Sequence, residues 1–300
     1  MLSDSRTKVI ECESADEFLS QISPRAGHFY DYGPSTFIFR GHPDARFALV
    51  PSVFRNGILV RTARGWRPVG DWSNREQIEA EYQTLRLFFE RSDAAGLPLP
   101  EDSQALRRLL FDGTHTPEFW PPFQLLSLLG LAQHYGVPTR LLDWSRSALK
   151  AAYFAAREAA VWHREPHTSP KDVTHLGVWA YSLMARDIDR TMPTAFSPEE
   201  RIEVVTAPRA GNPNLHAQEG VFTLYRPGRM SPEEPVDRKP LNVVFAESRS
   251  SQQLLHFRLP IGQAPVLLRL LAKEGANAVS LFPGFGGVVA GLTEERYWRT

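Results

Sequence analysis

Apolar residues recur at helical spacing in the first half of the chain. Such stripes follow Ser14 and Ser73 and fill the segment from Pro122 to Tyr135, and they are typical of helices with one buried face. Ser14 and Ser73 are each followed three residues later by glutamate, which is the capping-box spacing of a helix start. We expect a further helix to begin at Ser145 and to run through the alanine-rich segment to about residue 160.

Short runs of β-branched and aromatic residues predict strands, most of them in the second half of the chain. The predicted strands are 36–41, 176–183, 202–206, 221–225, 241–246 and 254–259, with one more helix at 265–274. Residues 61–71 and 284–287 are glycine-rich without periodicity and are expected to form a loop and a turn. With no internal repeat or linker, the sequence predicts a single-domain α+β fold. In it, a helix-rich N-terminal half packs on a mixed, mostly antiparallel sheet from the C-terminal half.

Composition removes several classes of function. The chain has 34 Lys plus Arg and 34 Asp plus Glu, so overall charge does not favour a polyanionic partner or a membrane surface. The single cysteine, Cys12, leaves no internal disulfide and no thiolate cluster for zinc. No apolar stretch approaches the roughly 20 residues that span a bilayer, and no secretory leader precedes residue 10, so we expect a cytoplasmic protein. Phosphate-binding, zinc-protease and nucleophile-elbow motifs are absent, and no metal is expected.

Three segments carry the candidate chemistry. Arg40 ends an apolar strand beside Gly41, and a guanidinium there needs an anion or several carbonyls to offset its desolvation. Residues 133–144 read QHYGVPTRLLDW, where an acid or base, a carboxylate and two aromatic rings lie close together in sequence. Residues 214–222 lead into a strand in which alternation puts Gln218 on one side and Glu219 on the other, so both do not face a pocket equally.

The same segments resemble the signature of the FRG domain family. The resemblance rests on Phe39-Arg40-Gly41, on the long 133–144 segment, on Gln218-Glu219-Gly220-Val221-Phe222 and on a closing Leu281-Phe282-Pro283. It implies three parts: an N-terminal helix and lead-in at 1–29, an FRG domain at 30–290 and a C-terminal tail at 291–300. Relatives usually continue after Leu-Phe-Pro with acidic residues, where this chain has Gly284 and Gly286.

The order of these elements is also similar to the layout of ADP-ribosyltransferases. That similarity implies NAD as a substrate and a macromolecular acceptor, protein or nucleic acid, in a bacterial toxin or phage-defence component. It implies catalytic roles for His134, Gln218 and Glu219. The cofactor-binding positions would be Arg40, Gly41, Tyr135, Arg140, Asp143, Trp144 and Ser145, with Arg40 gripping the pyrophosphate and an aromatic ring stacking on nicotinamide.

Two other interpretations remain open at this point. In the first, the protein is a non-catalytic sensor or interaction module, and Asp143 pairs with Arg140 or Arg40 in a buried structural network. In the second, the protein binds nucleic acid through residues 61–75, with Trp66 and Trp72 stacking on bases.

Overall fold

A seven-stranded mixed sheet forms the centre of the fold in the part of the chain that the computed structural model describes, residues 7–29, 37–112, 120–183, 200–208, 212–228, 230–247 and 254–298. Its strand order is β1-β9-β6-β2-β5-β8-β7, with β1 parallel to β9 and every other neighbouring pair antiparallel. The strands are β1 (Thr7–Glu11), β2 (Phe37–His42), β5 (Leu141–Ser145), β6 (His175–Ser182), β7 (Arg201–Val205), β8 (Gly220–Arg226) and β9 (Leu254–Pro260). The α+β class and the mostly antiparallel sheet are thus confirmed, although β1, β2 and β5 come from the first half of the chain.

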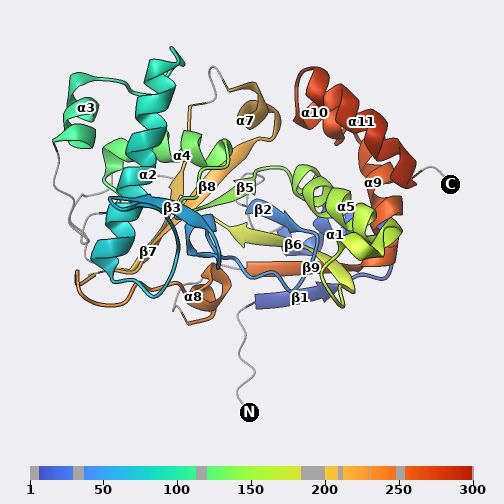
Figure 1. Ribbon diagram of the computed structural model, residues 1–300. Helices are drawn as coiled ribbons and strands as arrows, with labels where there is room; N and C mark the ends of the chain where they lie inside the picture. The colour runs from blue at the N-terminus through green and yellow to red at the C-terminus, as the bar shows by residue number, and fades with distance from the viewer. Residues whose placement is uncertain are drawn as a thin grey trace.

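Helices surround this sheet (Figure 1). They are α1 (Ala15–Ile22), α2 (Asn74–Ala94), α3 (Gln104–Phe111), α4 (Leu126–His134), α5 (Ala148–Arg164), α7 (Pro213–Ala217), α8 (Leu241–Glu247), α9 (Ala264–Lys273), α10 (Ala278–Leu281) and α11 (Phe285–Trp298). The predicted caps are confirmed at Ser14 and Ser73, whose hydroxyls accept hydrogen bonds from the backbone N–H groups of Glu17 and Glu76. Each cap satisfies a donor that a helix start leaves unpaired.

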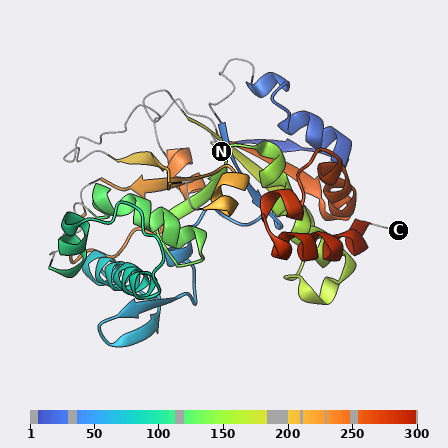
Figure 2. The ribbon, with the colours of Figure 1, turned by 90° about the horizontal axis from the view of Figure 1, so that it is seen from above.

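Two separate helix layers cover one face of the sheet. Over β2, β6 and β9, the helices α1, α5 and α9 enclose a cluster that includes Phe39 and Phe257. Over β5, β7 and β8, the helices α2, α3 and α4 enclose a second cluster that includes Phe222 and Leu224. Figure 2 shows these layers as two lobes. On the opposite face, α8 packs over side chains from both halves of the sheet, among them Trp144 and Trp179.

The two halves of the sheet are joined by strand pairing at a single position. Phe39 of β2 pairs with Ser145 of β5, whereas β2 pairs with β6 over six residues and β5 pairs with β8 over five. Beyond that pair β2 and β5 diverge, and each half keeps its own helix layer. The junction is therefore where the fold leaves space for a ligand.

Several local expectations were wrong. Residues 241–246 form a helix, because Leu241, Val244 and Phe245 are buried at helical spacing against the sheet. The alanine-rich helix is capped by Ser147, and Ser145 instead ends strand β5. The sequence patterns did not reveal β1 or β5.

Residues 61–71 also differ from the expected loop. Strands β3 (Leu59–Thr62) and β4 (Gly65–Pro68) form a hairpin, with Gly65 at a positive φ of 105° after the turn. Buried Val60 and Val69 hold the hairpin against α2.

Of the expected turn at 284–287, Gly284 precedes helix α11, whereas residues 285–287 lie in its first turn. The helix continues to Trp298 and so includes residues 291–298. A Cβ on Gly287 would lie 1.9 Å from the carbonyl oxygen of Phe282, so this glycine permits close packing within the helical C-terminus.

Candidate functional site

A pocket of about 410 Å³ lies at the junction between β2 and β5. Ligand pockets in proteins commonly range from about 300 to 1,000 Å³. Its walls come from the ends of β2, β5 and α4, from α5 and from the segment containing α7 and the start of β8. The lining residues are Phe39, Arg40, Gly41, Gln133, His134, Tyr135, Asp143, Trp144, Ser145, Ala151, Phe154, Asn214, Leu215, Gln218, Gly220, Phe222 and Phe282.

Arg40 bridges the diverging strands. Its Nη1 donates to the backbone carbonyl of Asp143 at 2.7 Å and lies 3.4 Å from the Asp143 carboxylate. Its Nε donates at 2.9 Å to Nε2 of His42. Burial, and then the charge of Arg40, hold the pKa of His42 well below its usual range, and the neutral ring donates from Nδ1 to the carbonyl of Phe47. Arg40 Nη2 has no partner among the described residues, so this donor remains for a ligand.

The carboxylate of Asp143 is held from two sides. Besides Arg40, the side-chain amide of Gln133 donates to Oδ2 at 2.8 Å. Gln133 is itself oriented by the hydroxyls of Ser52 and Thr139, which donate to its Oε1 at 3.2 and 2.7 Å. The Asp143 side chain is 47% exposed, so the network fixes the carboxylate while leaving it accessible from the pocket.

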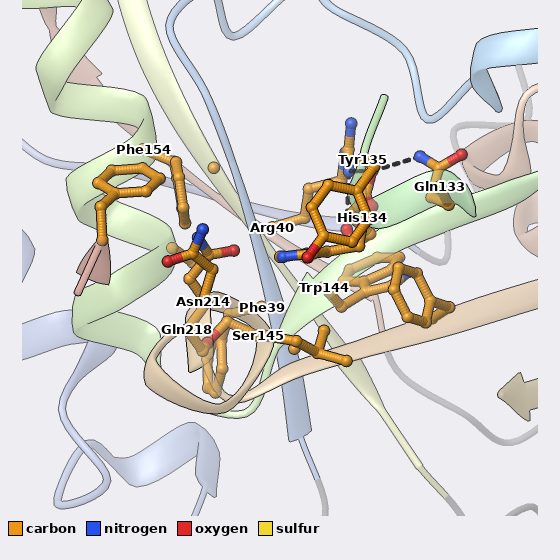
Figure 3. A pocket seen from close by; sticks show the side chains of 17 residues that line it. Phe39, Arg40, Gln133, His134, Tyr135, Trp144, Ser145, Phe154, Asn214 and Gln218 are labelled. Carbon is orange, nitrogen blue, oxygen red and sulfur yellow. Dashed lines mark hydrogen bonds and ion pairs between the residues drawn. The ribbon is translucent and has the colours of Figure 1, made fainter. Parts of the chain in front are cut away.

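His134 and Tyr135 form the end of α4 at the pocket wall (Figure 3). Burial lowers the pKa of His134, and the nearby Asp143 carboxylate opposes that shift. The imidazole is therefore largely neutral at pH 7 and able to accept a proton. Tyr135 is 60% exposed, with its ring 5.3 Å from that of His134 in an edge-on arrangement. An exposed ring in this position offers a face to a planar ligand.

Gln218 and Asn214 lie across the pocket from Tyr135 and His134 (Figure 3). The amide nitrogen of Gln218 donates to the carbonyl of Leu281 at 3.3 Å, which leaves its Oε1 as an acceptor. Ser145 is buried, and its hydroxyl donates to the backbone carbonyl of Gln218 at 2.8 Å. Ser145 therefore holds the Gln218 segment against β5.

Several sequence-derived candidates have structural partners instead of an open face toward this pocket. Arg140 lies outside the pocket and forms a buried two-pronged ion pair with Glu81, at 2.7 and 2.8 Å. Glu219 also lies outside, and its carboxylate is 2.7 Å from Nζ of Lys150. Trp144 is among the lining residues, but its indole packs in the cluster on the opposite sheet face and donates to Thr223.

Gly41 lines the pocket, and helix α5 requires it to be glycine. A Cβ at this position would lie 1.9 Å from the carbonyl oxygen of Ala151. The sequence interpretation assigned this glycine to the approach of a ligand, whereas the backbone of α5 makes the close approach.

Other lining residues were not assigned a role from the sequence. Gln133 and Asn214 begin two of the candidate segments, so their positions were marked although their roles were not. Phe282 belongs to the closing Leu281-Phe282-Pro283 of the family resemblance, which gave it no place in the site. Phe154 on α5 had no local signal, because an apolar residue on a helix is ordinarily part of the core. Their position at a pocket depends on how the helices pack.

The described residues contain no group of three or more His, Cys, Asp or Glu side chains placed to hold a metal ion. Within the same ranges, no helix combines the length and the apolar character needed to cross a bilayer.

Comparison with known proteins finds one family. Residues 35–163 match the family model described as the FRG domain, a range that includes Arg40 and the 133–144 segment and ends before Gln218. No curated protein and no solved structure matches the chain. Residues 35–163 are therefore similar to the FRG domain, and the two sequence signatures in the matched range meet at the pocket.

Proposed function

We propose that the pocket binds NAD and that the protein releases nicotinamide and transfers the ADP-ribose to a macromolecule. The observation that carries this proposal is the convergence of Arg40, Tyr135, His134 and Gln218 on one pocket. Their segments are separated by about 90 and 80 residues of sequence. They supply an anion-binding donor, a stacking ring, a neutral base and a hydrogen-bond acceptor.

Arg40 is suited to the pyrophosphate. Its free Nη2 donor points to a charge-assisted hydrogen bond with a phosphate oxygen. The Asp143 carboxylate lies 3.4 Å from Nη1 of Arg40 and leaves Nη2 open, so a diphosphate oxygen would have a charged donor to bind. Tyr135, with Phe154 and Phe39 in the lining, would hold a planar ring.

Gln218 and His134 are suited to the reacting sugar and the acceptor. Breaking the bond between ribose and nicotinamide builds positive charge on the ribose, which the Asp143 carboxylate would stabilise. Oε1 of Gln218 would accept a hydrogen bond from a ribose hydroxyl. A neutral His134 would take the proton that an acceptor hydroxyl loses as it forms its bond to the ribose.

The proposed functional unit extends beyond the matched residues to about 290, as the sequence resemblance implies. Gln218 and Phe282 lie outside the matched range and line the same pocket as Arg40. Depletion of NAD or modification of a host macromolecule in the bacterial cytoplasm would suit a toxin or phage-defence component.

The experiment is to incubate the purified protein with NAD and to follow nicotinamide release by chromatography. Gln218→Ala, His134→Ala and Tyr135→Ala should each reduce release, because each removes one of the proposed roles. Glu219→Gln is the matched control: it neutralises the adjacent carboxylate, which pairs with Lys150 outside the pocket. It should release nicotinamide at the wild-type rate.

Thermal stability in the presence of NAD provides the second readout. Wild-type protein should be stabilised by NAD, since a ligand that binds only the folded state raises the midpoint of unfolding. Neither stabilisation nor release in the wild type would reject the proposal and favour the non-catalytic module, in which the Arg40–Asp143–Gln133 network serves only to join the two halves of the sheet.

A further inference from the structure

The hairpin of β3 and β4 presents one open face. Strand pairing places Arg61 opposite Trp66 and Leu59 opposite Pro68, so these four side chains share a face. On the other face, Val60 is fully buried against α2. Trp66 is 56% exposed and Leu59 is 54% exposed. An indole this exposed, beside a guanidinium on the same face, is available for contact with a partner.

The hairpin is also locally basic in a chain that is neutral overall. No aspartate or glutamate occurs between Asp44 and Asp71, whereas this stretch contains five arginines. Arg61 on the open face and Arg64 in the turn form no ion pair with any described residue. Arg67 lies on the other face, where it adds to the Ser73 hydrogen bonds that lower the pKa of Glu76. The uncompensated charge is thus concentrated beside Trp66.

The base of the hairpin is linked to the pocket wall through residues 52–58. Ile58 accepts a backbone hydrogen bond from Val69 at 2.8 Å and donates one to the carbonyl of Arg55 at 3.4 Å. One turn earlier, the Ser52 hydroxyl donates to Gln133, which holds Asp143 in the pocket wall. Burial, and then the charge of Arg40, lower the pKa of Arg55, and the Asp143 carboxylate opposes that shift.

We propose that the open face of this hairpin, formed by Trp66, Arg61 and Arg64, binds single-stranded nucleic acid. Guanidinium groups neutralise phosphates, and an exposed indole stacks on an unpaired base whatever its sequence. An acidic peptide would use the charges and leave the indole without a role. That the bound strand is the acceptor of ADP-ribose rests on the proposed function, whereas the binding itself does not.

The test is fluorescence anisotropy with a labelled single-stranded oligonucleotide of about 12 nucleotides, within the site sizes of roughly 4–16 nucleotides known for such surfaces. Binding is measured without NAD between about 50 and 200 mM salt. The double variant Arg61→Gln/Arg64→Gln should weaken binding and make the slope of log K against log salt shallower by about 1.4, at ~0.7 for each phosphate that is no longer neutralised. Trp66→Ala should weaken binding about 5- to 150-fold and leave the slope unchanged.

A matched control separates the hairpin from net charge. Arg108→Gln/Arg269→Gln removes two exposed arginines of α3 and α9, which also form no ion pair with described residues, and should retain wild-type affinity and slope. Equal weakening by the two double variants would overturn the proposal. The proposal would also be overturned if the wild-type protein did not bind the oligonucleotide at low salt. A third contradicting result would be that polyglutamate competes as strongly as unlabelled oligonucleotide while the Trp66→Ala variant binds normally.

The two proposals fail in different ways. The Trp66→Ala variant, whose indole is exposed, should unfold at the wild-type temperature and should still bind NAD. The Gln218→Ala variant should bind the oligonucleotide as wild type does. Oligonucleotide binding by a protein that never consumes NAD would overturn the acceptor role of the strand and would leave the hairpin surface established.

Discussion

Replacing Arg140 by leucine should lower the stability of the protein without altering the chemistry of the pocket. The Arg140 guanidinium donates from Nε and Nη2 to the two carboxylate oxygens of Glu81, and the side chains are only 5% and 2% exposed. Trp120 and Gln77 also donate to this carboxylate. Removing Arg140 would leave a buried negative charge with neutral donors only, which costs about 3–5 kcal/mol.

The magnitude can be converted into a shift in the midpoint of thermal unfolding. An unfolding entropy of about 2.1 cal/mol/K per residue gives about 0.6 kcal/mol/K for 300 residues. The expected loss therefore lowers the midpoint by about 5–8 °C in calorimetry. The control is Arg75→Leu, which breaks an ion pair with Glu233 whose side chains are 66% and 76% exposed. It should cost less than about 1 kcal/mol and lower the midpoint by under about 2 °C.

NAD binding by the same variants provides the refuting result. If Arg140→Leu unfolds at the wild-type temperature but is no longer stabilised by NAD, Arg140 is a ligand-binding residue and the buried-pair reasoning is wrong. If both readouts change, comparison with Glu81→Gln decides, because that variant alters the partner of Arg140 and leaves the guanidinium in place.

Three further predictions concern single residues. Gly41→Ala should destabilise the protein and reduce NAD binding, because the added Cβ would meet the Ala151 carbonyl oxygen at 1.9 Å and push α5 away from β2. Calorimetry and NAD titration check this prediction, and an unchanged midpoint of thermal unfolding would contradict it. Arg40→Ala should abolish NAD binding and also lower the free energy of unfolding by about 1.5–3 kcal/mol, because the side chain is only 13% exposed and donates to Asp143. A variant that loses only NAD binding, or only stability, would contradict a role of Arg40 in both. Burial lowers the pKa of His256 to about 3 from an unfolded value near 6.5. The contribution of this neutral histidine to the free energy of unfolding is therefore present above pH 6.5. It should fall by about 2 kcal/mol between pH 6.5 and 5, because the unfolded state takes up a proton there and the folded state does not. Calorimetry of wild type and His256→Leu checks the last prediction, and identical pH profiles would refute it.

Local sequence patterns determined the elements whose stabilising contacts lie within a few residues. The Ser14 and Ser73 caps and the strands near 176–183, 221–225 and 254–259 could be predicted because capping and alternation are short-range effects. The family could be recognised for a similar reason, since two of its signatures are contiguous segments within residues 35–163.

Sequence patterns gave the wrong secondary structure where tertiary contacts determine which element forms. The run at 241–246 has β-branched residues, yet it is a helix because three of its residues bury at helical spacing on the sheet. The hairpin at 59–68 forms because α2 covers Val60. Strand β5 is short and its side chains alternate between two differently covered faces, so its residues show no simple pattern.

The segments that carry unusual polar residues can be found from the amino-acid order alone, because a guanidinium after an apolar strand or a histidine beside a tyrosine is visible there. Which of these groups remain available to a ligand depends on tertiary contacts. Arg140 and Arg40 illustrate the difference. Arg140 is engaged in an ion pair with the buried carboxylate of Glu81, whereas Arg40 bridges two diverging strands and keeps one donor free. The physical reason is that the partner of a charged side chain comes from a distant segment, Glu81 in one case and Asp143 in the other, and long-range packing alone brings such segments together.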